Sequence, residues 1–446
     1  MSAQCKLAVL LAAVSMVLTA SLPGRAQEEI FSLGFQLGPG ARAIAMGGAF
    51  SSVGGDYTAS FWNPAALANI RRIEVYGSLT HLMRKNNVAL LENNAAFGVN
   101  RDRDEENFTK FQSLGVAYPV PTVRGSLVFS FGFNRIKTYD SNFDFRAFNQ
   151  TPDDRVNQAF KEIETGGLNA WVFSGAVDVT RNISLGAGLN FWTGGTDFGR
   201  TFREVDRDDI YTFQDFTEED GLNTDITGFN AKLGALYRAG GILRFGAAIT
   251  TPVTFKVEED WSTRETLNFD DGTFSDSLAT GIFEYRIKSP WTFSGGVSLH
   301  LLNFVLAGDL EYNDWSQIEY KTEPPDSQFT QTSANRIIRD TYRATTRIRL
   351  GGEFTLPLTG LSFRAGYFRD PSVFENADPD EDKQFYSAGV GLLLDKQVKL
   401  DIAYVHGFWK RFHDNAAEQT LQSEDIGRYV EDVKINKVFI SVAFRF

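Results

Sequence analysis

The chain ends in VFISVAFRF (residues 438–446), a stretch in which a large apolar residue occupies every second position. In a β-strand, successive side chains point to opposite faces of the sheet. One face of this strand is therefore apolar and consists of Val438, Ile440, Val442, Phe444 and Phe446. The other face carries Ser441, Ala443 and Arg445. The pattern predicts a strand that separates an apolar environment from a more polar one.

The same alternation recurs along the chain. Four further stretches place their apolar residues on one face: 127–133, 348–356, 361–367 and 398–404. A period of two predicts an all-β fold. By itself it fits a soluble sandwich, whose apolar face meets another sheet, as well as a membrane barrel, whose apolar face meets lipid.

The lengths of the connections separate these two architectures. The pattern predicts about fourteen strands after residue 71. Short and long links alternate between them, as the short periplasmic turns and long outer loops of outer-membrane barrels do. Six short links are expected around Pro121–Gly125, Thr180–Asn182, Arg238–Gly241, Leu301–Asn303, Pro357–Gly360 and Asp395–Gln397. Seven long, polar links alternate with them, at 85–106, 147–166, 203–222, 260–282, 322–343, 371–382 and 411–432. Residues 71–446 are therefore predicted to form an antiparallel transmembrane β-barrel with both ends on the periplasmic side.

Residues 1–26 have the features of a secretory signal peptide. A short basic start is followed by an uncharged apolar run of 14 residues, Leu7–Ala20, and by small residues before an expected cleavage at Gln27. A membrane-spanning helix needs about 20 residues, so the run indicates export rather than an anchor. The single cysteine, Cys5, lies before the run, so the exported chain is expected to have no disulfide.

The composition excludes some classes of function. The 446 residues include 44 Lys+Arg and 56 Asp+Glu, a net charge of −12, and loss of Lys6 and Arg25 with the signal would lower it to −14. Such a chain is not expected to bind nucleic acid, which requires a basic surface. The 39 phenylalanines coexist with a mean hydropathy of −0.21. This combination is expected when strands give half of their side chains to lipid and half to a polar lumen.

Residues 27–70 do not alternate and are rich in glycine: Gly34, Gly38, Gly40, Gly47, Gly48, Gly54 and Gly55. Glycine at this density indicates turns and close backbone approach. A barrel of about fourteen strands would leave a sizeable pore if its interior were empty. We therefore expect residues 27–70 to form a plug, or hatch, inside the lumen.

This segment resembles the N-terminal hatch of the FadL/TodX family of outer-membrane transporters of long-chain fatty acids and aromatic hydrocarbons. The resemblance rests on residues 40–50, with Gly47 and Gly48, and on residues 60–67, with the triplet Asn63-Pro64-Ala65. Weaker similarities lie at residues 115–119, 309–315 and 364–367. The resemblance implies a monomeric barrel of fourteen strands in the outer membrane. It also implies uptake of a hydrophobic small molecule by hatch movement and lateral release into the bilayer.

Two other functions remain open at this point. Related barrels include shuttle proteins, so a structural or shuttle component of a secretion or assembly apparatus is the alternative. A general porin is disfavoured by the plug. No metal site or cofactor is expected, because His81, His300, His406 and His413 lack the spacing of metal ligands. No serine motif supports an enzyme.

The resemblance implies an apolar pocket beside the hatch. Candidate ligand contacts are the nearly alternating residues Ile30, Phe31, Leu33, Phe35 and Leu37, with plug packing as the alternative. Arg364 is a candidate for binding a carboxylate, because arginine can form a two-pronged pair. The favoured alternative is that the arginines expected in the lumen form salt bridges with Asp309, Glu311, Glu353 and Asp401, and that Arg42 joins them.

Further residues are expected at the barrel wall. Pro290 and the pair Gly194–Gly195 are two candidate bends for a lateral opening. Trp171, Trp192, Trp291, Trp315 and Trp409 fall near expected strand ends, where they would form aromatic girdles or pack internally. Outer-membrane lipid and lipopolysaccharide would surround such a barrel. The terminal Phe446 resembles the signature that the barrel-assembly machinery recognises.

Overall fold

The computed structural model describes residues 37–90, 103–148, 156–326, 328–414 and 428–446. Three helical turns come first: α2 (Ala41–Ala45), α3 (Ala59–Trp62) and η1 (Pro64–Asn69). Later turns and helices are η2 (Trp315–Gln317), α4 (Gln331–Thr341) and η3 (Pro379–Glu381). No helix in the described ranges is long and apolar enough to cross a membrane.

Strands make up most of the described chain, and their pairings are antiparallel. In chain order the segments are β1 (Glu74–Leu90), β2 (Arg103–Val120), β3 (Leu127–Thr138), β4 (Ser141–Phe148), β5 (Val156–Asp178), β6 (Ile183–Asp206), β7 (Phe213–Ala239), β8 (Leu243–Thr250), β9 (Thr254–Phe269), β10 (Phe274–Lys288), β11 (Thr292–Leu301), β12 (Phe304–Asp314), β13 (Glu319–Tyr320), β14 (Ala344–Thr355), β15 (Leu361–Asp370), β16 (Lys383–Leu394), β17 (Val398–Asp414) and β18 (Arg428–Arg445).

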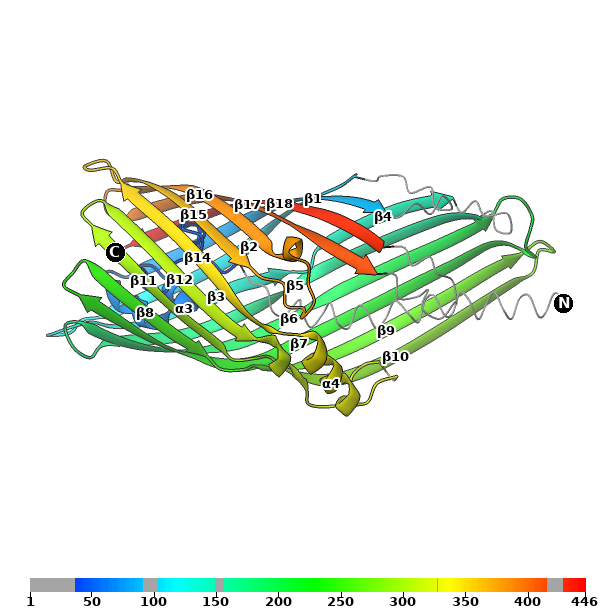
Figure 1. The fold of residues 1–446 in the computed structure, drawn as a ribbon, viewed down its shortest axis with the longest axis horizontal. Helices are drawn as coiled ribbons and strands as arrows, with labels where there is room; N and C mark the ends of the chain where they lie inside the picture. Colours follow the sequence, from blue (N-terminus) through cyan, green and yellow to red (C-terminus); the bar gives the residue numbers. More distant parts are fainter. Residues whose placement is uncertain (1–36, 91–102, 149–155, 327, 415–427) are drawn as a thin grey trace.

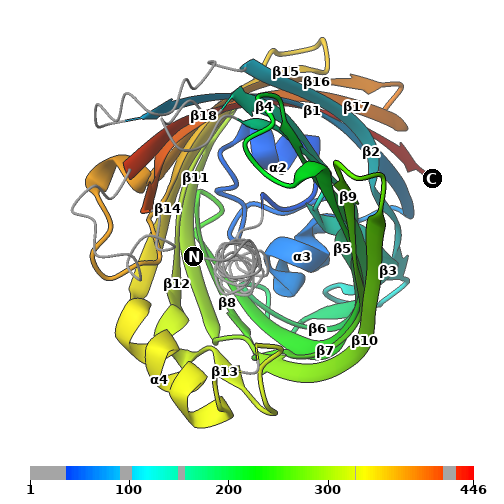
Figure 2. The same cartoon turned by 90° about the vertical axis from the view of Figure 1, so that its right-hand side faces the viewer.

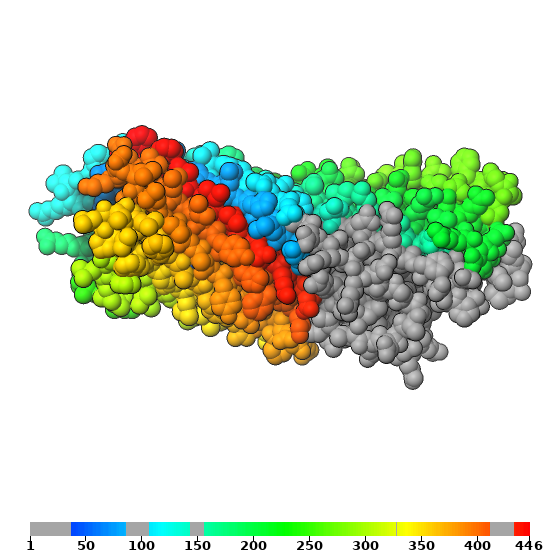
Figure 3. Space-filling model, turned by 90° about the horizontal axis from the view of Figure 1, so that it is seen from above, coloured from blue at the N-terminus to red at the C-terminus, as the bar shows by residue number. Residues whose placement is uncertain are grey.

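Four wall strands are each interrupted once. β3 continues as β4, β8 as β9, β10 as β11, and β12 as β13; for example, β3 and β4 both pair with β5. The eighteen described segments therefore form fourteen wall strands. The first and the last strand pair from Glu74 with Arg445 to Leu90 with Tyr429, which closes the ring. Figure 3 shows β18 and β1 side by side on the surface. The predicted barrel and its strand number are confirmed.

The two faces of the wall follow the predicted alternation. On β18, Ile440 and Phe444 are exposed on the outside, while Phe439 and Ser441 are buried inside. β3 shows the same order, with Phe129 and Phe131 outside and Val128 and Ser130 inside. Closure leaves the spanning backbone without free edges, so only side chains meet the lipid. The six expected short links join successive strands, and the short turns gather at the end of the barrel where the C-terminus lies (Figure 1).

At the opposite end, β5, β6, β7, β9 and β10 extend far beyond the other strands (Figure 1). We call this part the raised wall: residues 156–167, 195–206, 213–225, 258–269 and 274–284. Below it the outward side chains are apolar, for example Phe191 and Phe229. Within it they include Arg203, Glu219 and Arg264. Because charged side chains do not face lipid without a large cost, the raised wall lies outside the membrane.

The raised wall corrects three predicted loops. In the expected link 147–166, residues 156–166 form the first part of β5 instead. Residues 203–222 and 260–282 were expected to be long polar links, but only 207–212 and 270–273 lie between the strands there. Outside the membrane both faces of a strand can be polar, so the alternation that marks a spanning strand disappears. Backbone pairing with β5, β6 and β9 extends β7 to 27 residues nonetheless. A spanning strand needs only about 9–11 residues.

Residues 37–70, here called the hatch segment, lie inside the ring of strands. Figure 2 looks along the barrel and shows α2 and α3 within it. Most of their side chains are buried, including Ile44, Met46, Phe50 and Tyr57. The hatch segment packs against β15–β18 through α2 and against β5–β7 through η1. It therefore bridges opposite sides of the wall.

Candidate functional site: the hatch seat and a luminal cavity

The hatch segment rests on a set of inward-facing glycines. A Cβ atom added to Gly115 would lie 2.1 Å from the ring of Tyr57, and one added to Gly186 would lie 2.4 Å from the backbone nitrogen of Ala65. These glycines lie opposite one another on adjacent strands: Gly115 with Gly132, Gly186 with Gly234, Gly246 with Gly296, and Gly351 with Gly366. Any larger residue would displace the hatch, so the fit requires glycine on the wall.

Two motif glycines have a conformational role in the hatch itself. Gly47 and Gly48 have φ angles of 63° and 73°, which favour glycine. Gly47 also lies against the backbone of β14 and β15, where a Cβ would come within 2.6 Å of the carbonyl oxygen of Leu350. The motif therefore provides both a turn and a contact surface.

Asn63 connects the hatch to itself and to the wall. Its Oδ1 accepts a hydrogen bond from the Ala65 nitrogen at 3.0 Å, as expected for a residue that forms a turn before proline. Its Nδ2 donates to the carbonyl oxygens of Ser51 and Ala235, at 2.7 and 3.0 Å. Pro64 begins η1, where its missing N–H costs nothing. Asn63 is fully buried, so these bonds are not exchanged with water.

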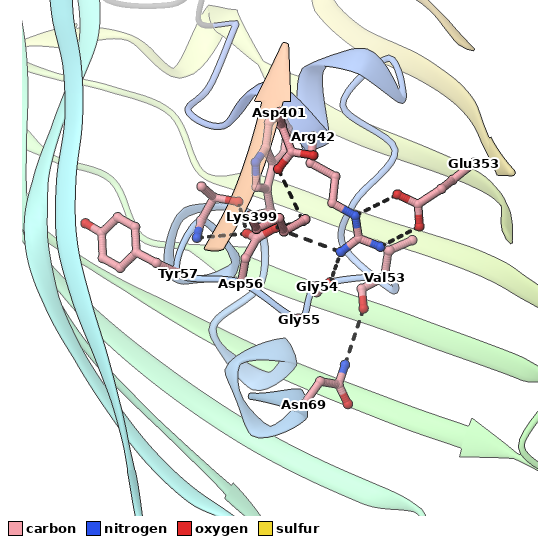
Figure 4. A network of polar contacts seen from close by, with 12 residues as sticks. Arg42, Val53, Gly54, Gly55, Asp56, Tyr57, Asn69, Glu353, Lys399 and Asp401 are labelled. Carbon is pink, nitrogen blue, oxygen red and sulfur yellow. Dashed lines mark hydrogen bonds and ion pairs between the residues drawn. The ribbon is translucent and has the colours of Figure 1, made fainter. Parts of the chain in front are cut away.

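A network of ion pairs joins the hatch to β14, β15 and β17 (Figure 4). Arg42 binds the carboxylate of Glu353 through Nε and Nη2, each at 2.8 Å. Arg364 lies between Glu353 and Asp401, at 2.6 and 2.8 Å. Lys399 contacts Asp401 at 3.3 Å and Asp56 of the hatch at 3.8 Å. The charges of this network therefore pair with one another, as the favoured alternative proposed, whereas Asp309 accepts backbone N–H groups of Phe50 and Ser51 instead.

The predicted ligand contacts are only partly described. Ile30, Phe31, Leu33 and Phe35 lie outside the described residues, as does the predicted signal peptide. Leu37 is partly buried against the apolar cluster that contains Ile44 and Phe439. The Arg364 side chain is 2% exposed and is held by its two carboxylates. Its role as a ligand contact stays a prediction.

A cavity of about 120 Å³ lies between the hatch segment and the wall on the side of β6–β12. Five aromatic side chains line it: Phe61, Trp62, Trp192, Phe255 and Trp315. The edges of Phe61 and Phe255 meet the rings of Trp62 and Trp192, with centroid distances of 5.2 and 5.8 Å. Aromatic rings in such edge-to-face contacts hold one another in place. Part of the cavity lining is therefore a fixed aromatic surface.

Polar groups in the cavity are largely bonded within the protein. Asn230 Oδ1 accepts from Asn190 Nδ2 and Trp192 Nε1, both at 2.9 Å. Trp315 Nε1 donates to Thr345 at 2.8 Å, and Trp62 Nε1 donates to the carbonyl oxygen of Pro39 at 3.1 Å. These bonds fix the aromatic rings rather than reach into the open space.

The positions of three tryptophans correct the predicted girdle, and one of them, Trp409, packs against Phe385 of an inner apolar cluster. Trp171 and Trp291 face outward, 42% and 41% exposed, as expected for the membrane interface. Trp192 and Trp315 point inward and are buried at the cavity. Proximity to a strand end does not show which face of the strand a side chain occupies, because a shift of one residue moves it to the other face. Sequence reasoning therefore missed two cavity residues, although the parity of Trp192 within β6 indicated its face.

The wall is interrupted beside the cavity. β8 ends at Thr250 and β9 begins at Thr254, while the adjacent β10 ends at Lys288 and β11 begins at Thr292. Pro252 and Pro290 lie in these two gaps, and neither has an N–H for the ladder. The second gap agrees with the predicted bend at Pro290. Gly194 and Gly195, the other candidate, lie within β6, which remains paired on both sides there.

A closed antiparallel barrel with an apolar outer belt, charged walls beyond it and a chain segment folded inside defines a plugged β-barrel of the outer membrane. The family model described as outer membrane protein transport protein (OMPP1/FadL/TodX) matches residues 31–446. The chain belongs to this family, whose members are outer-membrane barrels that transport hydrophobic compounds.

Solved structures show the same fold. A Pseudomonas aeruginosa FadL homologue is 16% identical, with 90% of this chain and 96% of that chain covered and a TM-score of 0.57. The P. putida toluene transporter TodX is 12% identical, with 92% and 99% covered and a TM-score of 0.61. The Ralstonia pickettii toluene transporter TbuX is 14% identical, with 92% and 98% covered and a TM-score of 0.53. At these identities the similarity concerns the fold alone. No curated protein is significantly similar in sequence.

Proposed function

We propose that this protein takes up small hydrophobic molecules through the outer membrane and binds them in the luminal cavity on the way. The observation that carries the proposal is an aromatic cavity that lies between the hatch and an interrupted part of the wall. In this proposal, residues 1–26 are the export signal, residues 27–70 the hatch and residues 71–446 the barrel. Two of the solved relatives are described as toluene transporters, which supports a hydrophobic cargo.

The size of the cavity favours a small cargo. An apolar cavity of about 150 Å³ in another protein accepts benzene, whereas pockets for drug-sized ligands occupy about 300–1,000 Å³. With about 120 Å³, this cavity accommodates little more than one aromatic ring. A longer molecule would need more space than this cavity provides, and we propose that movement of the hatch's N-terminal arm would create it. Ile30, Phe31, Leu33, Phe35 and Leu37 of that arm remain proposed ligand contacts.

We propose lateral release through the gap at Pro252 and Pro290. Thr251, Val253, Ser289 and Pro290 belong both to this gap and to the cavity lining. On the outside, Trp291 and Phe229 mark the apolar belt. A hydrophobic molecule that passes between these segments enters lipid without crossing water. The straight path to the periplasm is obstructed by the buried hatch segment.

A disulfide across the gap tests this route. Val253 and Ser289 are bonded through backbone and side chain, at 2.9 Å from Ser289 N to Val253 O and 3.0 Å from Val253 N to Ser289 Oγ. We expect the oxidised Val253→Cys/Ser289→Cys variant to take up labelled toluene at least about tenfold more slowly than the reduced form. The control pair Thr266→Cys/Asp276→Cys, opposite one another in the raised wall, should not slow uptake.

The outcomes separate the parts of the proposal. Uptake that does not exceed that of cells without the protein would refute hydrophobic transport. Uptake that is equal in the oxidised and reduced forms would refute only the lateral route at this gap.

A further inference from the structure

Among the described residues that line the cavity, Lys232 is the cation that forms no salt bridge with a carboxylate, although the charge of Glu311 acts on it from a longer distance. We infer that the cavity selects molecules that combine a single aromatic ring with a carboxylate, and that Lys232 binds the carboxylate. This inference rests on the proposed function and specifies its class of substrate. It follows from the bonding of Lys232, from the pairing of the other charges and from the aromatic lining.

The ammonium group of Lys232 has spare hydrogen-bonding capacity. It donates to the carbonyl oxygen of Phe61 and lies 4.9 Å from the centre of the Phe61 ring. No salt bridge to a carboxylate is formed by Lys232 among the described residues. An ammonium has three N–H donors, so the others are available to a ligand. A carboxylate would make charge-assisted bonds, which are about twice as strong as neutral ones.

The other cations at the cavity are already neutralised. Arg347 pairs with Glu311 and with Asp370, the latter at 2.7 Å. Arg349 pairs with Glu311 at 3.1 Å and lies over the ring of Trp62. Glu311 therefore uses both carboxylate oxygens on arginines. Among the described residues at the cavity, Lys232 is therefore the cation that can form an ion pair with an anionic ligand.

The remaining carboxylate orients the ligand. Asp309 accepts the backbone N–H groups of Phe50 and Ser51 through Oδ2, at 2.9 and 2.8 Å, and its Oδ1 has no hydrogen-bond partner. A ligand carboxylate placed there would be repelled. The ligand's charge is thus directed towards Lys232, and its ring towards the aromatic side chains on the wall.

Neutral hydrocarbons and long-chain acids fit this site less well. Toluene would fill the space beside the aromatic rings but would leave the Lys232 donors without a partner, and leaving polar groups unpaired on binding is costly. A long-chain acid could reach Lys232 but would exceed the volume of about 120 Å³. An aromatic carboxylate such as benzoate satisfies both requirements.

Binding measurements on the purified full-length protein test the inference, with benzoate, toluene and palmitate as probes at neutral pH. Quenching of tryptophan fluorescence is a suitable signal, because Trp62, Trp192 and Trp315 line the cavity. We expect benzoate to bind at least about tenfold more tightly than toluene. Lys232→Met should weaken benzoate binding by at least about tenfold, as expected for loss of one charge-assisted hydrogen bond, and should tighten rather than weaken toluene binding, because no donor is then left unpaired.

Lys437→Met is the matched control. Lys437 is also a partly buried lysine over a phenylalanine ring, 5.2 Å from the centre of Phe439, but it does not line the cavity. Benzoate affinity should be unchanged in this variant, and Lys232→Arg should retain part of it. Equal affinity of the wild type for benzoate and toluene, or full benzoate affinity in Lys232→Met, would overturn the inference while leaving hydrophobic transport intact. If none of the three probes binds, both the inference and the proposed function fail.

Discussion

Arg42 and Glu353 form a two-pronged salt bridge, with both N···O distances at 2.8 Å, although 311 positions separate them in the chain. One residue belongs to the hatch and the other to β14, so this pair links the plug directly to the wall (Figure 4). The same carboxylate also accepts a hydrogen bond from Arg364 of β15. The pair is nearly buried, with side chains 16% and 8% exposed.

Replacing Arg42 should loosen the hatch. Arg42→Ala leaves a buried carboxylate with one partner fewer, and breaking such a pair typically costs about 3–5 kcal/mol. We expect a lower thermal midpoint and a larger ion conductance in planar bilayers. Arg264→Ala is the control, because its pair with Asp276 is half exposed at 3.7 Å and is worth less than about 1 kcal/mol. A conductance equal to that of the wild type would show that the hatch does not depend on this pair.

The glycine seat should not tolerate a side chain. Gly115→Ala would place a methyl group 2.1 Å from the Tyr57 ring, a clash that we expect to destabilise the barrel by about 1–3 kcal/mol. Tyr57→Ala should relieve the clash in the double variant, so the two effects would not add. Gly77→Ala is the control, since no atom lies within 4 Å of its added Cβ. Additive losses in denaturant titrations would contradict a direct contact.

The raised wall should be sensitive to pH. Burial, followed by the nearby Asp220 charge, raises the pKa of Glu218 to about 7, although Arg200 opposes the shift. Because the folded pKa exceeds the unfolded value of 4.5, this group stabilises the wall most below pH 4.5. The contribution is lost as the pH rises through about 7.

Hydrogen exchange of the β6–β7 hairpin checks this sign. Protection should decrease between pH 6 and pH 8 after correction for intrinsic exchange, on either side of the Glu218 pKa of about 7. The change should be smaller in Glu218→Gln, which cannot ionise. Glu219→Gln on the exposed face is the control. An undiminished pH dependence in Glu218→Gln would assign the effect to another group.

Phe446 should matter more for assembly than for the folded barrel. Its side chain is 72% exposed, and its backbone N–H donates to the carbonyl oxygen of Ile73 at 2.9 Å. Phe446→Ala should therefore fold normally into detergent micelles but reach the outer membrane at several-fold lower levels. Phe444→Ala, on the same face, is the control. Normal membrane levels of Phe446→Ala would refute recognition of this residue by the assembly machinery.

The alternation of side chains was sufficient to predict a strand and its two faces where one face meets lipid and the other meets the lumen. The alternation at residues 438–446 predicted which side of β18 meets lipid, because lipid and lumen demand opposite side chains. The pattern failed at residues 203–222 and 260–282, where no lipid requires an apolar outer face. There the strands continue because their backbones form hydrogen bonds with neighbouring strands. Backbone hydrogen bonds do not depend on the alternation of side chains, so these strands could not be predicted from it.

The candidate site was harder to predict for a similar reason. Trp192 and Lys232 lie on the paired strands β6 and β7, whereas Trp315 follows β12 and lines the same cavity only in the folded barrel. The sequence indicated that arginines and acids would share the lumen, but it did not show which cation would remain without a carboxylate. That distinction depends on distances of a few ångströms between strands.

The sequence by itself determined the membrane barrel, its fourteen strands and the family, because period-two alternation, link lengths and the hatch motif are local properties of the chain. Only the tertiary structure decided the height of the raised wall, the glycine seat of the hatch and the aromatic cavity with Lys232. These features arise from contacts between residues far apart in sequence. Their energies depend on the register of the closed ring, and a shift of one residue would turn each of these side chains to the opposite face of the wall.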